Sequence, residues 1–106
     1  MNNPKKNYFH TANYGNVLMQ MGRYPIGGAT YIQLVGKDKY PGEPIATLTV
    51  NLPNNNKMLN KGEFFVKTWS ENEMIANDAL KSGLFVDTGR RVETGYVEAQ
   101  IWKFAE

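Results

Sequence analysis

The segment from Ile45 to Leu52 alternates apolar and polar side chains almost residue by residue. Ala46, Leu48 and Val50 fall on one side of an extended chain, with threonines on the other side. A period of two is the pattern of a β-strand that has one face in a core and the other in water, an arrangement typical of antiparallel sheets. This segment therefore predicts a protein built around such a sheet.

The same period, over shorter stretches, predicts further strands on both sides of this one. The expected strands cover residues 16–24, 31–35, 63–69, 84–86 and 95–104. Glycine, proline and asparagine favour turns in the segments between them. The expected turns are Gly27-Gly28, the polar loop over residues 37–44, the segment from Pro53 to about Gly62, and Gly89-Arg90-Arg91.

One segment has helical spacing instead. Ser70 and Glu73 form an S-x-x-E pattern, which predicts a capping box at the start of a helix. An apolar stripe follows, formed by Met74, Ile75, Ala79 and Leu80. Gly83 is expected just past the helix end, where a positive φ is favourable. The predicted order of elements is β-β-β-β-α-β-β.

A chain of 106 residues with 42% hydrophobic residues is long enough for one domain with its own core. We expect this domain over residues 14–106, preceded by a flexible N-terminal arm over residues 1–13. One apolar helix face cannot cover five or six flat strands, so the sheet must curve. The predicted fold class is α+β, with a curved, mainly antiparallel sheet of five to six strands that wraps over one helix or partly closes into a barrel.

The side chains that most catalysis requires are scarce in this sequence. The chain has no cysteine, which excludes a disulfide framework, a thiol nucleophile and sulfur-ligated metal sites. Its one histidine, His10, lies in the expected arm, and the carboxylates lack the spacing of a metal site. We therefore expect no enzymatic activity, no metal and no cofactor. Because the chain has no long apolar run and no signal-peptide core, we expect a cytoplasmic protein without membrane contact.

Binding to a partner is the function that the composition favours. Thirteen aromatic residues exceed what a small core needs, and several fall in turns or off the main apolar face. Tyr31 and Gln33 are expected to lie beside Glu98, Gln100 and Trp102 on one sheet surface, a composition common in protein interfaces. The candidate partner-binding residues are Tyr31, Lys37, Lys39, Tyr40, Arg90, Arg91 and Trp102. The structural alternative is a second small core under the helix or the arm.

The net charge of +2 is unevenly divided along the chain. Residues 1–62 hold seven basic and two acidic residues, whereas residues 63–106 hold five basic and eight acidic ones. The basic part can form a positive face, or simply a solvated surface whose lysines keep edge strands from pairing. The functional alternative is a small nucleic-acid-binding module that uses the basic loops and the sheet aromatics.

Several segments together resemble a known family. They are Gly22-Arg23-Tyr24, Ile32-Gln33-Leu34, the stretch from Glu43 to Pro53, Glu63-Phe64-Phe65-Val66, Gly83-Leu84, Thr88-Gly89-Arg90 and Ile101-Trp102-Lys103-Phe104. In these the chain is similar to a small domain family of unknown function found in Firmicutes and on their phages and conjugative elements. Members often carry a cysteine and a proline near the final strand, and this chain has neither there.

The resemblance implies a genomic setting and no catalytic residues. In that setting, a small protein without enzymatic signatures is expected to be a mobile-element accessory factor. We expect it to bind and inhibit a host defence component, a protein or a ribonucleoprotein, in the style of anti-CRISPR proteins. A monomer and a homodimer are both compatible with the sequence.

Overall fold

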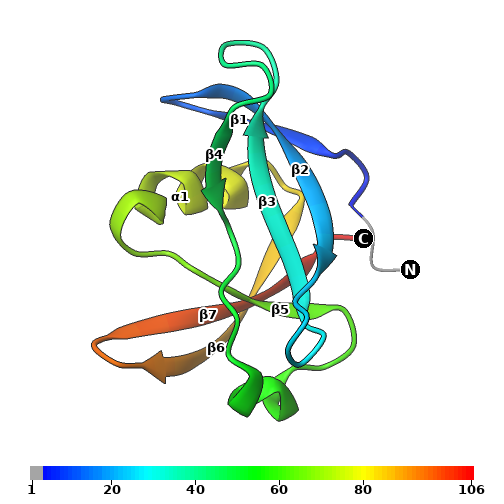
Figure 1. Cartoon of the computed structure of the whole chain (residues 1–106), viewed down its shortest axis with the longest axis vertical. Helices are drawn as coiled ribbons and strands as arrows, with labels where there is room; N and C mark the ends of the chain where they lie inside the picture. The colour runs from blue at the N-terminus through cyan, green and yellow to red at the C-terminus, as the bar shows by residue number, and fades with distance from the viewer. Residues whose placement is uncertain (1–3) are drawn as a thin grey trace.

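The computed structural model describes residues 4–106 and shows an α+β protein, as the sequence predicts (Figure 1). The strands are β1 (Tyr8–Thr11), β2 (Gly15–Arg23), β3 (Thr30–Gly36), β4 (Pro44–Thr47), β5 (Glu63–Val66), β6 (Phe85–Thr94) and β7 (Val97–Phe104). The α-helix is α1 (Glu73–Lys81), and two 3₁₀ helices are η1 (Pro53–Met58) and η2 (Ser70–Asn72). The described chain thus has seven strands, where five to six were expected.

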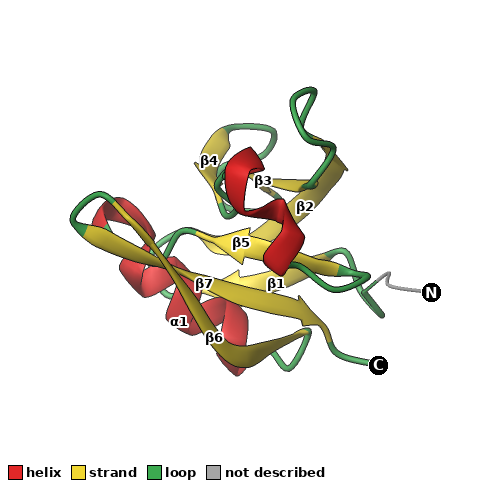
Figure 2. Cartoon of the chain, turned by 90° about the horizontal axis from the view of Figure 1, so that it is seen from below, coloured by secondary structure: helices red, strands yellow, loops and turns green. Residues whose placement is uncertain are grey.

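The strands form two antiparallel sheets that do not close into a barrel. The first, called sheet A, has the order β1-β2-β3-β4, and the second, called sheet B, has the order β5-β7-β6. Sheet A lies toward the viewer in Figure 1, and α1 packs behind it. Viewed from below in Figure 2, sheet B and α1 lie against each other on the far side of the molecule from β3 and β4.

The segment with the clearest alternation, residues 45–52, joins the two sheets. Its first half is β4, and the Leu48 N–H still donates to the Ile32 carbonyl of β3 at 3.0 Å. Its second half leaves β3 and pairs with sheet B, where the Val50 N–H donates to Phe65 O at 3.1 Å. One extended segment therefore serves both sheets, which is why no regular strand spans all eight residues.

The main core lies between the two sheets and α1. Strands of both sheets and the helix contribute to it, with Leu34, Phe64, Ile75 and Trp102 among its buried members. The large rings pack edge to face or tilted, as for Phe85 and Trp102 with centroids 5.5 Å apart. A second, smaller cluster lies around Phe65 and Ile101. It includes Val92 and Ala99, with Leu52 and Trp69 packed against it.

The expected arm is wrong for part of its length. Tyr8–Thr11 form strand β1, which pairs with β2 in the register Phe9↔Val17. The Phe9 side chain is only 3% exposed and contributes to the main core. A four-residue strand gives too short an alternation to recognise, and it is stable only because a longer strand receives it. Residues 1–3 of the expected arm lie outside the described residues.

The expected capping box does not form. Ser70 has a φ of 55° and begins η2, and α1 starts only at Glu73 without a side-chain cap. Asn72 precedes α1 and directs its side chain away from the helix, toward the backbone of both sheets. Tertiary contacts therefore fix the helix start in place of the local pattern. The predicted glycine at the helix end is confirmed, since Gly83 has a φ of 79°.

The turn expected at Gly89-Arg90-Arg91 is a bulge inside a long strand. β6 runs through it, with Asp87 opposite Trp102 and Arg91 opposite Gln100. Three residues of β6 therefore face one residue of β7, and Gly89 absorbs the distortion with a φ of 88°. The strand expected over residues 84–86 is thus the first part of a ten-residue strand.

Candidate functional site

Sheet A has one face toward the core and one face that no described element covers (Figure 1). In β3, Ile32 and Leu34 point to the core, so the intervening Tyr31, Gln33 and Val35 lie on the other face. The register adds Tyr8 and Leu18 beside Val35, and Thr47 beside Gln33. We call this surface the outer face; it consists of Tyr8, Leu18, Gln20, Tyr24, Tyr31, Gln33, Val35 and Thr47. Gln20 is exposed, Val35 is buried by its neighbours, and the other six are half-buried.

Hydrogen bonds within the outer face hold its polar side chains in place. The Gln33 Oε1 atom accepts from Tyr31 OH and from Thr47 Oγ1, both at 2.8 Å. The Gln33 Nε2 atom donates to Ala46 O at 3.1 Å. With both ends of its amide bonded, Gln33 fixes the position of its neighbours, so this part of the surface is preorganised.

Tyr24 extends this arrangement toward the lower end of the sheet. Its ring packs edge-on against Tyr31 with centroids 5.1 Å apart, and its hydroxyl lies 3.0 Å from Thr49 Oγ1. Burial raises the pKa of the Tyr24 hydroxyl, which therefore stays neutral at physiological pH. Thr49 Oγ1 in turn accepts the Ile32 N–H, so the aromatic pair is anchored to the backbone of β3.

The opposite end of the outer face is basic and aromatic. The Nζ atoms of Lys6 and Lys37 lie 5.3 and 5.2 Å from the centroid of the Tyr8 ring. In the loop after β3, at the top of Figure 1, Lys39 lies 5.6 Å from the ring centroid of Tyr40. These distances are typical of cation–π contacts, which orient the ammonium groups without neutralising their charge. We call these five residues the basic end.

One carboxylate interrupts the basic end. The Asn16 Nδ2 atom donates to Asp38 Oδ2 at 2.9 Å, and this bond, with help from Lys37, lowers the pKa of Asp38. Asp38 therefore remains charged and fixed between the lysines of the loop. The loop itself holds two lysines and two carboxylates, Asp38 and Glu43, so the excess positive charge of this end comes from Lys6.

Four of the seven predicted partner-binding residues belong to this region. Tyr31 lies on the outer face, and Lys37, Lys39 and Tyr40 lie at its basic end. The structure does not bring the other three to the same place. Arg90 and Arg91 lie in β6 of sheet B, and Trp102 lies in β7.

Trp102 is part of the core, so the expectation that it is a surface residue is wrong. Its exposed fraction is 0%, and its indole N–H donates to Gln100 Oε1 at 2.8 Å. The expected surface that joined Tyr31 and Gln33 to the last strand is also wrong. β3 pairs with β2 and β4, whereas β7 pairs with β5 and β6.

Arg90 and Arg91 are occupied by ion pairs within sheet B and its loops. Arg90 donates to Met58 O at 2.6 Å and to the Glu63 carboxylate. Arg91 makes a two-pronged bond to Asp87, with both N···O distances 2.8 Å. Burial alone would raise the pKa of Glu63, but the bonds from Arg90 and Asn60 outweigh it and lower that pKa. The bond from Arg91 likewise lowers the pKa of Asp87.

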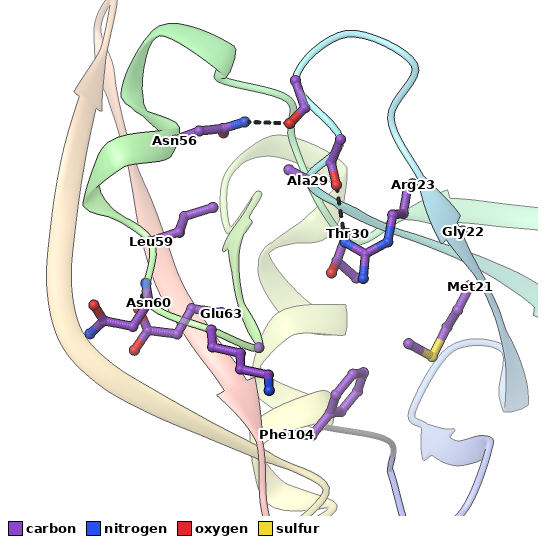
Figure 3. Close-up of a pocket in the computed structure, with 14 residues that line it drawn as sticks. Met21, Gly22, Arg23, Ala29, Thr30, Asn56, Leu59, Asn60, Glu63 and Phe104 are labelled. Atoms are coloured by element: carbon purple, nitrogen blue, oxygen red, sulfur yellow. Dashed lines mark hydrogen bonds between the residues drawn. The ribbon is translucent and has the colours of Figure 1, made fainter. Parts of the chain in front are cut away.

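The sequence analysis missed a cleft at the lower end of the molecule (Figure 3). It has a volume of about 710 Å³ and lies between β2, the turn after it and the segment from η1 to β5. Met21 and Arg23 of β2 face Leu59 and Glu63 across it, and Phe104 lies at its lower end. The sequence signal available was the pair Gly27-Gly28, which was interpreted only as a turn.

Groups able to perform chemistry do not gather at either place. Within residues 4–106, no three His, Cys, Asp or Glu side chains are grouped so that they can hold a metal ion. His10 is exposed on β1. No helix of the described chain has the length and apolar character needed to cross a membrane.

Comparisons of the chain with protein-family models, with curated proteins and with solved structures find no match.

Proposed function

We propose that this protein is a non-enzymatic binding protein that docks onto another protein through the outer face of sheet A and its basic end. The observation that carries the proposal is the uncovered outer face, whose polar side chains are already held in place by the Gln33 hydrogen bonds. A preorganised surface loses little conformational entropy on binding, so more of its contact energy is available as affinity.

The composition of this surface fits a protein partner with an acidic rim. Tyrosines, which are common anchors of protein interfaces, occupy its centre and both ends. The lysines of the basic end favour negative charge on the partner and raise the rate of encounter. Asp38 and Glu43 in the same loop favour a partner of mixed charge over a continuous phosphate backbone.

The resemblance to a family of Firmicutes and their mobile elements extends the proposal to a biological role. In that setting the partner is a component of a host defence complex, and the protein inhibits it by occupying its surface.

The test is a pull-down from a Firmicutes host lysate with tagged full-length protein, followed by mass spectrometry and an assay of host immunity. The double variant Lys37→Glu with Lys39→Glu should lose the captured partner and the inhibition of immunity. The control is Lys81→Glu with Lys103→Glu, the same charge change at exposed residues of α1 and β7. Capture of no defence component, together with intact immunity, would refute the inhibitor role.

A second candidate is single-stranded nucleic acid, and one observation favours it. Tyr8 lies between two lysines, an arrangement in which a base can stack while the ammonium groups contact phosphates. Labelled single strands should then shift at about 50 mM salt, where phosphate contacts are strong, and the Lys37→Glu with Lys39→Glu variant should abolish the shift. Arg90 and Arg91 should contribute little, because each is paired with a carboxylate that is much less exposed than Asp38, the partner of Lys37 at 3.5 Å.

A further inference from the structure

Strand β2 is much longer than the strand that pairs with its outer edge. β2 has nine residues and β1 has four, and the last pair of their register is Tyr8↔Leu18. One further bond follows, from the Met19 N–H to Asn7 O at 2.7 Å. Among residues 4–106, no later backbone bond joins this side of β2. Within this part of the chain, the edge of β2 from Gln20 to Arg23 is therefore open.

The direction of the backbone groups at this edge follows from the ladder. In an antiparallel sheet, successive residues direct their N–H and C=O groups to opposite sides of the strand. Met19 faces β1, so Met21 and Arg23 face the same side, whereas Gln20 and Gly22 face β3. Two N–H donors and two carbonyl acceptors are thus available to a further strand.

The cleft lies beside this open edge. Met21 and Arg23 are the β2 residues whose side chains enter it, and Leu59, Glu63 and Phe104 form its other walls (Figure 3). Met21 is 43% exposed, so part of its apolar side chain is available to a ligand in the cleft. A volume of about 710 Å³ is within the range of ligand sites.

The charges of the cleft do not balance. Glu63 is the one carboxylate among its lining residues, its side chain is 7% exposed, and it is paired with Arg90. Arg23 and Lys61 also line the cleft and are exposed. Arg23 bonds only to a neutral acceptor, the Gly28 carbonyl at 3.1 Å. The cleft therefore offers two positive charges that the described residues leave without a counter-charge.

We propose that this cleft binds an extended peptide segment of a partner, which adds to sheet A as a strand at the edge of β2. Main-chain hydrogen bonds to Met21 and Arg23 hold the segment, in the manner of β-strand addition. Alternate side chains point into the cleft, where an apolar one contacts Met21 and Phe104 and an acidic one contacts Arg23 and Lys61. Four residues of edge span about 13 Å, so a short peptide is sufficient.

The proposal is tested by panning a phage-displayed library of random dodecapeptides on the immobilised full-length protein. Enriched peptides are then synthesised with a fluorophore, and their affinity is measured by fluorescence anisotropy. The enriched sequences should carry Asp or Glu and alternate apolar residues. Amide exchange of Met21 and Arg23, followed by NMR, should slow when the peptide is added.

Two variants separate the main-chain contribution from the charge contribution. Met21→Pro removes the N–H that faces the open edge and leaves the ladder with β3 intact, so the affinity should fall at least tenfold. Met21→Leu keeps both the N–H and an apolar side chain and should stay within twofold. Arg23→Glu with Lys61→Glu should weaken acidic peptides at least tenfold, whereas Lys81→Glu with Lys103→Glu should not.

Several results would overturn the proposal. The proposal is wrong if no peptide is enriched, if the enriched peptides lack acidic residues, or if they bind the charge-reversed variant as tightly as the wild type. If Met21→Pro does not fold, the charge-reversed pair decides. A dimer in light scattering that dissociates in Met21→Pro would assign the edge to a second copy of the chain. Neither variant alters the Gln33 network or the basic end, so the result is independent of the proposed function.

Discussion

Replacing Asn72 with alanine should show how strongly one side chain joins α1 to both sheets. Asn72 is 0% exposed, and its Nδ2 atom donates to Thr47 O at 2.7 Å and to Lys67 O at 3.2 Å. Because β4 directs the Leu48 N–H toward β3, the Thr47 carbonyl faces the other way, at the edge of sheet A. Asn72 therefore satisfies a carbonyl at the β4 edge of sheet A and another just after β5 of sheet B.

The expected cost follows from the two bonds. Each is worth about 1 kcal/mol, and a buried carbonyl left without a donor costs about 1–3 kcal/mol. The Asn72 Oδ1 atom is itself buried without a partner, and removing it offsets about 1 kcal/mol of this loss. We therefore expect Asn72→Ala to lower the free energy of unfolding by about 2–4 kcal/mol. A domain of this size is stable by about 5–15 kcal/mol, so the loss is a large part of the total. It corresponds to a decrease in Tm of about 10–20 °C.

Asn72→Asp is a second test, because aspartate has nearly the same side-chain shape as asparagine but carries a charged oxygen acceptor in place of the Nδ2 donor. At pH 7 it should destabilise more than alanine, since a buried carboxylate would face two carbonyl oxygens. Burial would raise the pKa of this carboxyl in the folded state, so its penalty is present at neutral pH and is relieved as the pH falls through that raised value. Alanine should show no such pH dependence.

Urea unfolding followed by tryptophan fluorescence, at pH 7 and pH 5, gives both quantities. Asn77→Ala is the matched control, because Asn77 is an exposed amide of the same helix and its loss should change stability by no more than about 0.5 kcal/mol. A cost below about 1 kcal/mol for Asn72→Ala, or equal costs for alanine and aspartate at both pH values, would refute the reasoning.

Three further substitutions test other parts of the fold. The pKa of Glu63 is lowered in the folded state, so the ionised carboxylate stabilises the fold above about pH 4 and this stabilisation is lost as the pH falls through the folded-state pKa. In Glu63→Gln, stability measured by circular dichroism should therefore fall less steeply on acidification. Gly36→Ala would place a Cβ 1.8 Å from Tyr40 O and should cost about 1–3 kcal/mol in urea unfolding. Trp102→Ala should cost about 3–5 kcal/mol by the same assay, whereas a surface residue would cost little.

The sequence predicted the fold where a pattern is local. Period two identifies β2, β3 and β7 within a residue or two, because the alternation reports burial on one face of a single strand. It cannot report that the segment over residues 45–52 changes partner at Leu48, since its alternation continues while its ladder moves from β3 to β5. Buried Thr49 marks this point, and its hydroxyl is satisfied there by the Ile32 N–H and the Tyr24 hydroxyl.

In the candidate site, too, the sequence could place only those residues that share one strand. Placing Tyr31 and Gln33 together needed only the period of β3, and they are hydrogen-bonded neighbours on the outer face. Placing Trp102 beside them needed knowledge of which strands pair, which a single sequence does not contain. The charges of Arg90 and Arg91 looked available because their partners, Glu63 and Asp87, become neighbours through the η1–β5 segment and through the bulge in β6.

The cleft was beyond sequence reasoning because it depends on where a strand pairing stops. Its walls come from β2, from the turn that follows and from the segment before β5, which are far apart in the chain. The open edge exists because β1 begins only at Tyr8, opposite Leu18, while β2 continues to Arg23. Neither fact leaves a mark in the composition of these segments.

The outer face and the cleft lie on opposite sides of the same strand, β2. Its even residues lie on the outer face and its odd residues point to the other side, where Met21 and Arg23 line the cleft, so a strand added at the edge would place its own alternate side chains on both surfaces. One extended segment of a partner would thereby enlarge the outer face beside Gln20 while its other side chains fill the cleft. Arg23 and Lys37 lie at opposite ends of β2, since Arg23 is opposite Thr30 and the Lys37 N–H bonds to Asn16 O. For such a partner, Arg23→Glu and Lys37→Glu should each weaken binding and their losses of affinity should add, whereas a loss from only one of the two substitutions would mean that the partner uses one surface.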